Sequence, residues 1–242
     1  MNTSRKTAIK ESKVKITASS LIRLAGLSAI VAGLFYVAVG LFHPLNVLAS
    51  VTTTRWIIVH YLATAMGFFG ILGMVGLYAR QAEKTGWLGL AGFVLFSLWF
   101  ALMVGFCFVE AFILPRLATG LPAFVDGWMG MFNGTPSQIN LGILPTLWTI
   151  TTPLYLLGGL LFGIATFRAR ILSRWAAGLL AVGIVLGPIA ALFPPELQPK
   201  VAVPVGLALA WLGYSLWSER REKVSEPLPG LGSPQPVQTG TD

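Results

Sequence analysis

Three side chains that can bind ligands or transfer protons lie inside or beside long apolar stretches of this chain. They are His43, His60 and Glu110, and the histidines are the only 2 among 242 residues. Two imidazoles and a carboxylate can ligate a divalent metal ion, and an imidazole beside a carboxylate can transfer protons. The two histidines could also hold a haem between the first two apolar stretches, although their depths differ by about one helical turn. Each of these chemistries requires helices that bring the three residues together.

The apolar stretches are long enough to be membrane-spanning helices. Hydrophobic residues make up 55% of the chain and charged residues 11%, and the mean hydropathy is +0.75. A soluble domain has about a quarter charged residues, whereas a ~30 Å hydrocarbon layer is crossed by about 20 apolar residues. Six stretches meet that length, at 24–42, 56–78, 87–114, 143–167, 175–193 and 201–217. The sequence therefore predicts an all-α, six-helix bundle integral to a membrane.

Basic residues predict which side of the membrane each helix end faces. Most of the 17 Lys and Arg residues fall on one side: Arg5, Lys6, Lys10, Lys13, Lys15, Arg23, Arg80, Lys84, Arg168, Arg170, Arg174, Arg220, Arg221 and Lys223. The other side has Arg55, Arg116 and Lys200. Because Lys and Arg concentrate in cytoplasmic loops, both termini are expected in the cytoplasm, with Trp56 and Trp148 at the outer interface. The same pattern accounts for the net charge of +8, so nucleic acid is not an expected partner.

The predicted spans divide the chain into three parts. Residues 1–20 are expected to form a basic cytoplasmic segment and residues 21–223 the six-span transmembrane domain. Residues 224–242, rich in Pro and Gly, are expected to be a disordered cytoplasmic tail. The outer loop, 115–141, is unusually apolar and is expected to dip into the interface as a lid. Cys107 is the single cysteine, which excludes an internal disulfide and a Cys-x-x-Cys redox pair.

Polar residues of several spans gather near the outer ends of the helices. His60 lies five residues after Arg55, and Glu110 lies five residues before Pro115. Both are therefore expected roughly 7 Å below the outer surface, with His43 just above them. We predict an outward-facing pocket centred on His60 and Glu110. Its other candidate ligand-binding residues are His43, the outer-half residues Thr149, Thr152 and Tyr155 of the fourth span, and Asp126 in the loop above.

Purely structural roles are open for the same residues. His43 precedes Pro44 and can cap a helix end among the lipid headgroups. Glu110 can extend to the interface or pair with Arg55 or Arg116. His60 can donate a hydrogen bond to a neighbouring backbone carbonyl. A metal site built from His43, His60 and Glu110 lacks the local spacing of a motif such as H-E-x-x-H.

Glycines recur at helical spacing on several spans. They are Gly26, Gly33 and Gly40 on the first span, Gly67, Gly70, Gly73 and Gly76 on the second, and the pairs Gly159/Gly163 and Gly183/Gly187. Such residues allow helix backbones to approach closely where lipid supplies no hydrophobic drive. We expect packing within the bundle, and a second copy of the chain or another membrane protein stays open as a partner.

The types of residue in the spans favour one function over two alternatives. No span has a charge at mid-membrane, so no ion or proton pathway across the bilayer is evident. A glycine-rich phosphate loop and a Ser/His/Asp set are also missing from the sequence. Binding of a small apolar or amphipathic ligand, or of an ion, in the outward-facing pocket is therefore the leading hypothesis. The alternatives are a membrane-embedded enzyme or metal/haem protein that uses His60 and Glu110, and a structural or accessory membrane subunit.

Three stretches also resemble a known family. These are RLAGLSAIVAGLFYVAVG from Arg23, RWIIVHYLATAMGF from Arg55 and FVEAFILP from Phe108. They are similar to small multi-pass bacterial membrane proteins of unknown function, of which the DUF4386-like group is the nearest. The resemblance implies a bacterial plasma (inner) membrane location and no established activity.

Overall fold

The computed structural model describes residues 17–219; the expectations for residues 1–16 and 220–242 lie outside that range. Six helical stretches are long and apolar enough to cross a membrane: Ala18–Phe42, Thr54–Ala79, Ala82–Leu117, Leu144–Ala169, Arg174–Leu192 and Gln198–Ser218. The predicted all-α, six-helix membrane fold is confirmed. The first span begins at Ala18, inside the segment that the sequence assigned to the N-terminal region.

Several spans are composite. α1 (Ala18–Phe42), α3 (Thr54–Ala79) and α7 (Leu144–Ala169) are single helices. The third span joins α4 (Ala82–Phe108), the π-helical segment η1 (Val109–Ile113) and α5 (Leu114–Leu117). The fifth joins α8 (Arg174–Ile189) to the 3-10 turn η2 (Ala190–Leu192), and the sixth joins the 3-10 segment η3 (Gln198–Ala202) to α9 (Val203–Ser218). Two further helices, α2 (Leu48–Val51) and α6 (Pro122–Asn133), lie between spans.

Polar side chains fix where three of the spans begin. The side chains of Thr17, Thr53 and Ser173 each accept a hydrogen bond from the backbone N–H three residues later. These N-caps satisfy donors that have no partner inside the helix. The apolar stretch after each cap supplies the rest of the span.

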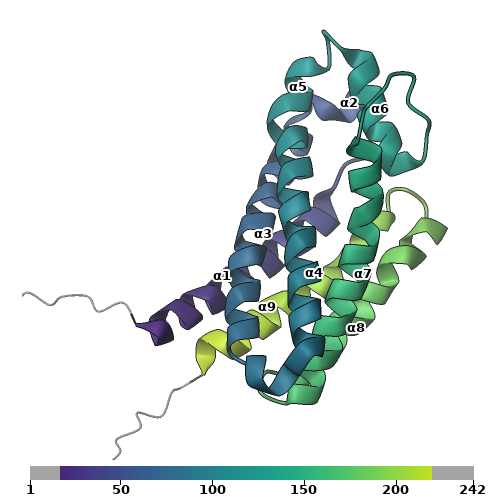
Figure 1. Ribbon diagram of the computed structural model, residues 1–242. Helices are drawn as coiled ribbons and strands as arrows, with labels where there is room; N and C mark the ends of the chain where they lie inside the picture. Colours follow the sequence, from purple (N-terminus) through teal and green to yellow (C-terminus); the bar gives the residue numbers. More distant parts are fainter. Residues whose placement is uncertain (1–16, 220–242) are drawn as a thin grey trace, which may run out of the picture.

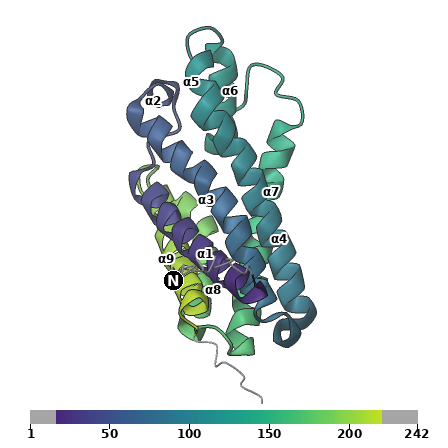
Figure 2. The same ribbon diagram turned by 90° about the vertical axis from the view of Figure 1, so that its left-hand side faces the viewer.

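The spans form a closed ring in chain order. α1 packs against α3, α3 against α4, α4 against α7, α7 against α8, α8 against α9, and α9 back against α1. Consecutive spans lie side by side and antiparallel, although the connection between the third and fourth spans is long and includes α6. The contact between α1 and α9 brings the first and last spans together, as Figures 1 and 2 show.

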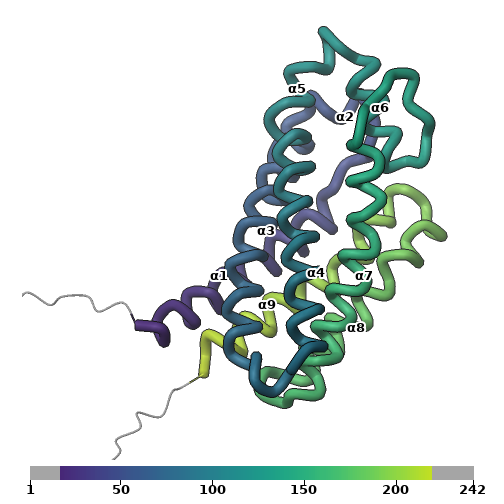
Figure 3. Tube along the Cα trace, viewed as in Figure 1, coloured from purple at the N-terminus to yellow at the C-terminus, as the bar shows by residue number. Residues whose placement is uncertain are grey.

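The two ends of the ring differ. One end, which we call the capped end, is covered by α2, α5 and α6 (Figure 1). The other, the basic end, holds the start of α1, the end of α9, and the α3–α4 and α7–α8 connections (Figure 3). Six basic residues of the described range lie in those segments: Arg23, Arg80, Lys84, Arg168, Arg170 and Arg174. The charge asymmetry read from the sequence therefore separates the two ends of the bundle.

The helices do not all reach the same height at the capped end. α3 and α7 each have 26 residues, whereas α8 and α9 each have 16. In Figures 1 and 2, α8 and α9 end well short of α3, α4 and α7 on this side. The bundle is therefore stepped, and η2 and η3 form the lower level.

Glycines set the closeness of the ring contacts. A Cβ at Gly26 would lie 2.9 Å from the Trp217 backbone nitrogen, and one at Gly33 would collide with the Gly206 and Ala210 backbone of α9. A Cβ at Gly73 would lie 2.8 Å from Ala29 on α1. Packing of these glycines within the bundle, rather than on a dimer face, is as expected.

Polar contacts hold the basic end together. The Arg80 guanidinium Nε donates to Glu219 Oε2 at 2.6 Å, which ties the end of α3 to the residue after α9. Gln81 Nε2 donates to Thr166 Oγ1 at 2.8 Å between two buried side chains. This end of the ring is thus closed by direct contacts between distant parts of the chain.

Candidate ligand-binding site

A local change in helix geometry positions Glu110. Pro115 has no N–H and its ring would clash with the carbonyl of a regular α-helix four residues earlier. Over Val109–Ile113 the helix widens instead, and the Leu114 N–H donates to the Val109 carbonyl. The π-helical partner of the Glu110 carbonyl would be the nitrogen of Pro115, which has no hydrogen to donate. Trp56 Nε1 on α3 donates to that carbonyl instead, at 2.9 Å.

His60 is fixed on α3 by its own helix and by the same tryptophan. Its Nδ1 donates to the Trp56 carbonyl oxygen at 2.8 Å, one turn earlier. The imidazole also stacks on the Trp56 indole with a 4.0 Å separation of ring centroids. Since a carbonyl oxygen only accepts, Nδ1 carries a hydrogen, and Nε2 is left facing α4. The structural role foreseen for His60, a bond to a neighbouring carbonyl, accounts for one of its two nitrogens.

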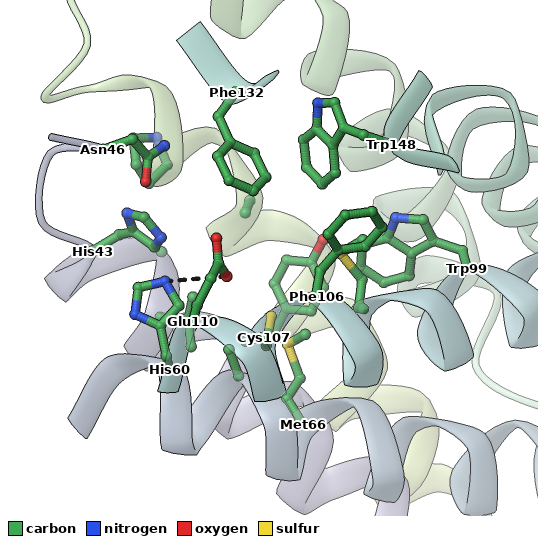
Figure 4. Close-up of a pocket in the computed structure, with 17 residues that line it drawn as sticks. His43, Asn46, His60, Met66, Trp99, Phe106, Cys107, Glu110, Phe132 and Trp148 are labelled. Carbon is green, nitrogen blue, oxygen red and sulfur yellow. Dashed lines mark ion pairs between the residues drawn. The ribbon is translucent and has the colours of Figure 1, made fainter. Parts of the chain in front are cut away.

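The free nitrogen of His60 points at the Glu110 carboxyl group. His60 Nε2 lies 3.4 Å from Glu110 Oε2, with the side chains only 1% and 7% exposed (Figure 4). The distance is that of an ion pair, but the angles do not make a hydrogen bond, and Nε2 has no hydrogen-bond partner among the described residues. Two bare acceptors would repel each other at this distance, so one proton resides on either the carboxyl or Nε2. The pair is uncharged overall in both cases.

The expected lid is helix α6. Trp128 Nε1 of α6 donates to Glu110 Oε1 at 3.4 Å. Asn133 Nδ2, at the end of the same helix, donates to the Asn46 carbonyl oxygen at 2.7 Å. Phe132 lines the space above the carboxyl group (Figure 4). The apolar outer loop therefore covers Glu110 and anchors itself to the connection between α1 and α3.

The pair opens onto a cavity of about 310 Å³ at the capped end. Most of its wall is aromatic or aliphatic, and the rings that line it are Tyr36, Trp99, Phe106, Phe132 and Trp148. Its polar edge consists of His43, Asn46, His60 and Glu110, and Figure 4 shows these side chains on the side facing Phe132. Ligand pockets commonly combine such an apolar wall with a few placed polar groups.

His43 lies at the rim of the cavity, just beyond the end of α1. It is the C-cap residue of that helix, as the structural alternative foresaw, and its Nδ1 donates to the Pro44 carbonyl oxygen at 2.7 Å. Its ring meets the His60 ring edge to face with centroids 5.1 Å apart. Burial lowers the pKa of His43, the bond to Pro44 opposes this, and the nearby Arg55 guanidinium lowers it further. His43 is thus expected to be neutral near pH 7.

A second cavity of about 360 Å³ adjoins the first. Thr152 and Tyr155 of α7 line it, together with Gly187 and Pro188 of α8. Two of the predicted site residues therefore belong to this second space rather than to the space around Glu110.

The remaining predicted site residues lie outside both cavities. Thr149 is exposed on α7 and its hydroxyl donates to the Pro145 carbonyl oxygen at 2.9 Å. Asp126 is exposed on α6 and lines neither cavity. Trp56, expected at the outer interface, lies in the first turn of α3 and is fully buried against His60, so its side chain does not face the lipid.

The basic residues that could have paired with Glu110 are engaged elsewhere. Arg55 Nε donates to the Phe42 carbonyl oxygen at 2.8 Å, and Arg116 donates to the Phe112 carbonyl. Neither forms an ion pair with Glu110 in the described structure. Glu110 is therefore buried against His60 rather than drawn out to the interface.

The metal and haem interpretations gain no support from this geometry. Among residues 17–219, no three His, Cys, Asp or Glu side chains are placed to hold a metal ion. His43, His60 and Glu110 lie near one another, and each Nδ1 donates to a backbone carbonyl, as a metal-binding histidine also does, but the three side chains do not converge on one point. The edge-to-face contact of the two imidazoles leaves no space for a haem between them.

Six apolar spans around a largely apolar cavity define a multi-pass integral membrane protein in contact with the lipid bilayer. Comparisons with protein-family models, with curated proteins and with solved structures find no match to this chain.

Proposed function

We propose that this protein binds a small amphipathic molecule in the cavity at its capped end. The observation that supports this most directly is the free His60 Nε2, 1% exposed and without a hydrogen-bond partner, beside a cavity of about 310 Å³. A buried polar atom left without a partner costs about 1–3 kcal/mol. A ligand that supplies the missing hydrogen bond would recover much of that cost.

The composition of the wall defines the kind of molecule. Five aromatic rings and the side chains of Met66 and Met103 favour an apolar ligand body. The polar edge is confined to one side, so one polar group on the ligand is enough to fix its orientation.

The setting proposed for the protein combines the charge asymmetry with the family resemblance. The excess of basic residues at the basic end favours both termini in the cytoplasm and the capped end, with its cavity, facing outward. The resemblance to DUF4386-like proteins favours a bacterial plasma membrane.

Binding can be measured with 1-naphthol, an aromatic body with a single hydroxyl group. Trp99 and Trp148 line the cavity, so saturable quenching of tryptophan fluorescence in detergent-purified protein is the expected signal. His60→Leu is expected to weaken binding about fivefold, since a hydrogen bond contributes about 1 kcal/mol. Thr64→Val is the matched control, because Thr64 is buried one turn further along α3 and lines neither cavity. Equal affinities for the wild type and His60→Leu would contradict the proposal.

One observation also supports an enzyme. A fixed imidazole tautomer 3.4 Å from a carboxyl group is an arrangement able to move a proton to or from a bound molecule. Recovery of the bound ligand chemically unchanged after prolonged incubation favours the binding protein, and its conversion favours the enzyme.

A further inference from the structure

The two cavities share a common wall. Tyr36, Trp99, Met103, Trp148 and Ala202 line both of them. Met103 is unbranched and is the most adaptable of the five, so its movement can join the two spaces. A ligand longer than the first cavity therefore has a direct continuation into the second.

The second cavity lies at a seam between helices that faces the lipid. Thr152 of α7, Pro188 of α8 and Ala191 of η2 line it, and all three are exposed at the surface of the bundle. The side chains around that seam are apolar: Leu192 is 83% exposed, Phe193 44% and Ile189 39%. The seam occurs where α8, with Pro188 in its last turn, ends at Ile189 and is followed by the short turn η2. The opening is therefore bordered by hydrocarbon-facing residues.

Two polar side chains along the second cavity are already engaged in hydrogen bonds. The Thr151 hydroxyl donates to the Trp148 carbonyl oxygen at 2.6 Å, and Gln198 Nε2 donates to the Phe193 carbonyl oxygen at 3.1 Å. The free buried acceptor of the joined space is instead His60 Nε2 in the first cavity. The joined space thus offers one fully buried acceptor without a partner, in the first cavity, and a mainly apolar passage from there to the second.

The anchoring point favours an uncharged group. Neither cavity is lined by Lys or Arg, and the ionisable residues facing Glu110 are Tyr36, His43, His60 and Cys107. Since His60 and Glu110 together hold one proton and no net charge, a charged ligand head would remain uncompensated in a buried site. A hydroxyl group fits either position of this proton, because it can donate to the member of the pair that lacks the proton and accept from the member that holds it. A carbonyl group, which only accepts, could bond only to the member of the pair that holds the proton.

We propose that the ligand is a single-chain amphiphile with a hydroxyl head, which enters sideways from the bilayer. The head lies beside the His60–Glu110 pair, on its cavity side and within hydrogen-bond reach of both, and the chain passes Met103 into the second cavity and reaches lipid at the seam between α7 and α8. This inference rests on the proposed binding function and adds the class of ligand and its route.

Photolabelling in phosphatidylcholine nanodiscs tests the route. The probe is tetradecan-1-ol with a diazirine near the end of its chain, and labelled residues are located by mass spectrometry. Labelling is expected on residues 152–156 and 187–191, and an excess of tetradecan-1-ol should compete it away. Tetradecane, tetradecanoate and tetradecyltrimethylammonium at equal mole fraction in the bilayer should compete at least about tenfold less well.

A variant that fills the second cavity tests the position of the chain. A Cβ at Gly187 would lie 3.0 Å from the Tyr155 ring, so Gly187→Trp places an indole in this space. Ala191→Trp fills it from the exposed edge and guards against misfolding of the first variant. Both variants are expected to abolish photolabelling at the seam. In competition with 1-naphthol, the affinity of tetradecan-1-ol should fall about tenfold, and the affinity of hexan-1-ol should stay the same. Gly105→Trp is the control. A Cβ at Gly105 would meet no other atom within 4 Å, and Gly105 does not line the second cavity.

The outcomes separate the two proposals. If hexan-1-ol and tetradecan-1-ol lose the same affinity in the Gly187 and Ala191 variants, or labelling is spread evenly over the lipid-facing helices, the chain does not use the second cavity. If tetradecanoate or tetradecyltrimethylammonium competes best, the hydroxyl head is wrong. In each case saturable 1-naphthol binding leaves the proposed function standing. Failure of 1-naphthol itself to bind contradicts the proposed function.

Discussion

His60 Nε2 and Glu110 Oε2 face each other across 3.4 Å inside the bundle, and both side chains are buried. Trp56 holds both sides of the pair: its carbonyl oxygen accepts from His60 Nδ1, and its indole N–H donates to the Glu110 carbonyl oxygen. One tryptophan on α3 therefore sets the separation between an imidazole on its own helix and a carboxyl group on the next span.

Removing either partner of the pair is expected to destabilise the bundle more than removing both. His60→Leu or Glu110→Leu alone leaves a buried polar group facing an apolar one, at a cost of about 1–3 kcal/mol. The double variant leaves none, so we expect a coupling energy of about 0.5–3 kcal/mol in a double-mutant cycle. SDS-induced unfolding in mixed micelles measures it. Strictly additive losses would mean that the two side chains do not interact.

Closure of the ring depends on the contact of α1 with α9 at Gly33. A side chain at this position would meet the Gly206 and Ala210 backbone, which cannot move aside as a flexible side chain could. We expect Gly33→Leu to lower the free energy of unfolding by about 1–3 kcal/mol or more. At Gly105 of α4 a Cβ has open space, and Gly105→Ala should be neutral or stabilising by up to about 1 kcal/mol. Comparable losses in both variants would contradict this packing.

Acidification below about pH 6.5 is expected to destabilise the rim of the cavity through His43. Burial lowers the pKa of His43 in the folded protein, so the unfolded chain binds the proton first. Its contribution to stability is therefore complete above the unfolded pKa and is lost as the pH falls through that value towards the folded one. Unfolding measured between pH 8 and pH 5 should show a shallower decline for His43→Gln than for the wild type. Parallel curves would rule out this role, since His60 and Glu110 remain in both proteins.

The proposed orientation can be tested with single cysteines. In a Cys107→Ala background, Thr119→Cys lies at the capped end and Glu83→Cys at the basic end, and both positions are exposed. A membrane-impermeant maleimide should label residue 119 in intact cells and residue 83 only after the cells are broken open. The reverse pattern would invert the topology and turn the cavity towards the cytoplasm.

The spans were predictable from sequence because hydrocarbon imposes a strong length requirement on apolar helices. Glycine spacing likewise predicted close packing. A side chain at Gly26 or Gly33 would meet the α9 backbone and keep α1 from approaching α9 so closely. The depth shared by His60 and Glu110 followed from counting residues from the span ends, and the structure brings the two together.

The side of each helix on which a given residue lies was harder to predict. Counting placed Thr149 with Thr152 and Tyr155, but depth alone does not tell which side of α7 faces a cavity, and Thr149 faces outward. The hydrophobic pattern gives no help, because a membrane helix is apolar on both its lipid side and its packed side. The burial of Trp56 inside the bundle was not foreseen for the same reason.

The spacing of Glu110 and Pro115 in the sequence pointed to the π-helical segment, although it was used only to estimate the depth of Glu110 in the membrane. Pro115 follows Glu110 by five residues, which is the spacing at which a π-helix would require a donor from the proline. The donor had to come from another helix, and no local pattern identifies Trp56 as its source. The aromatic wall of the cavity was missed because Trp99, Phe106 and Phe132 look like ordinary packing residues until the ring closes.

The shortness of α8 determines what fraction of the transmembrane potential acts at the His60–Glu110 pair. The fifth span has 19 residues, which is about 30 Å of helix and therefore about one hydrocarbon thickness. η3, which follows this span, contributes Pro199 and Ala202 to the wall of the first cavity. The His60–Glu110 pair is thus expected near the membrane surface, where a charge has crossed only a small fraction of the transmembrane potential. Ligand and proton exchange at this site should proceed at nearly the same rate in an energised cell as in a depolarised one.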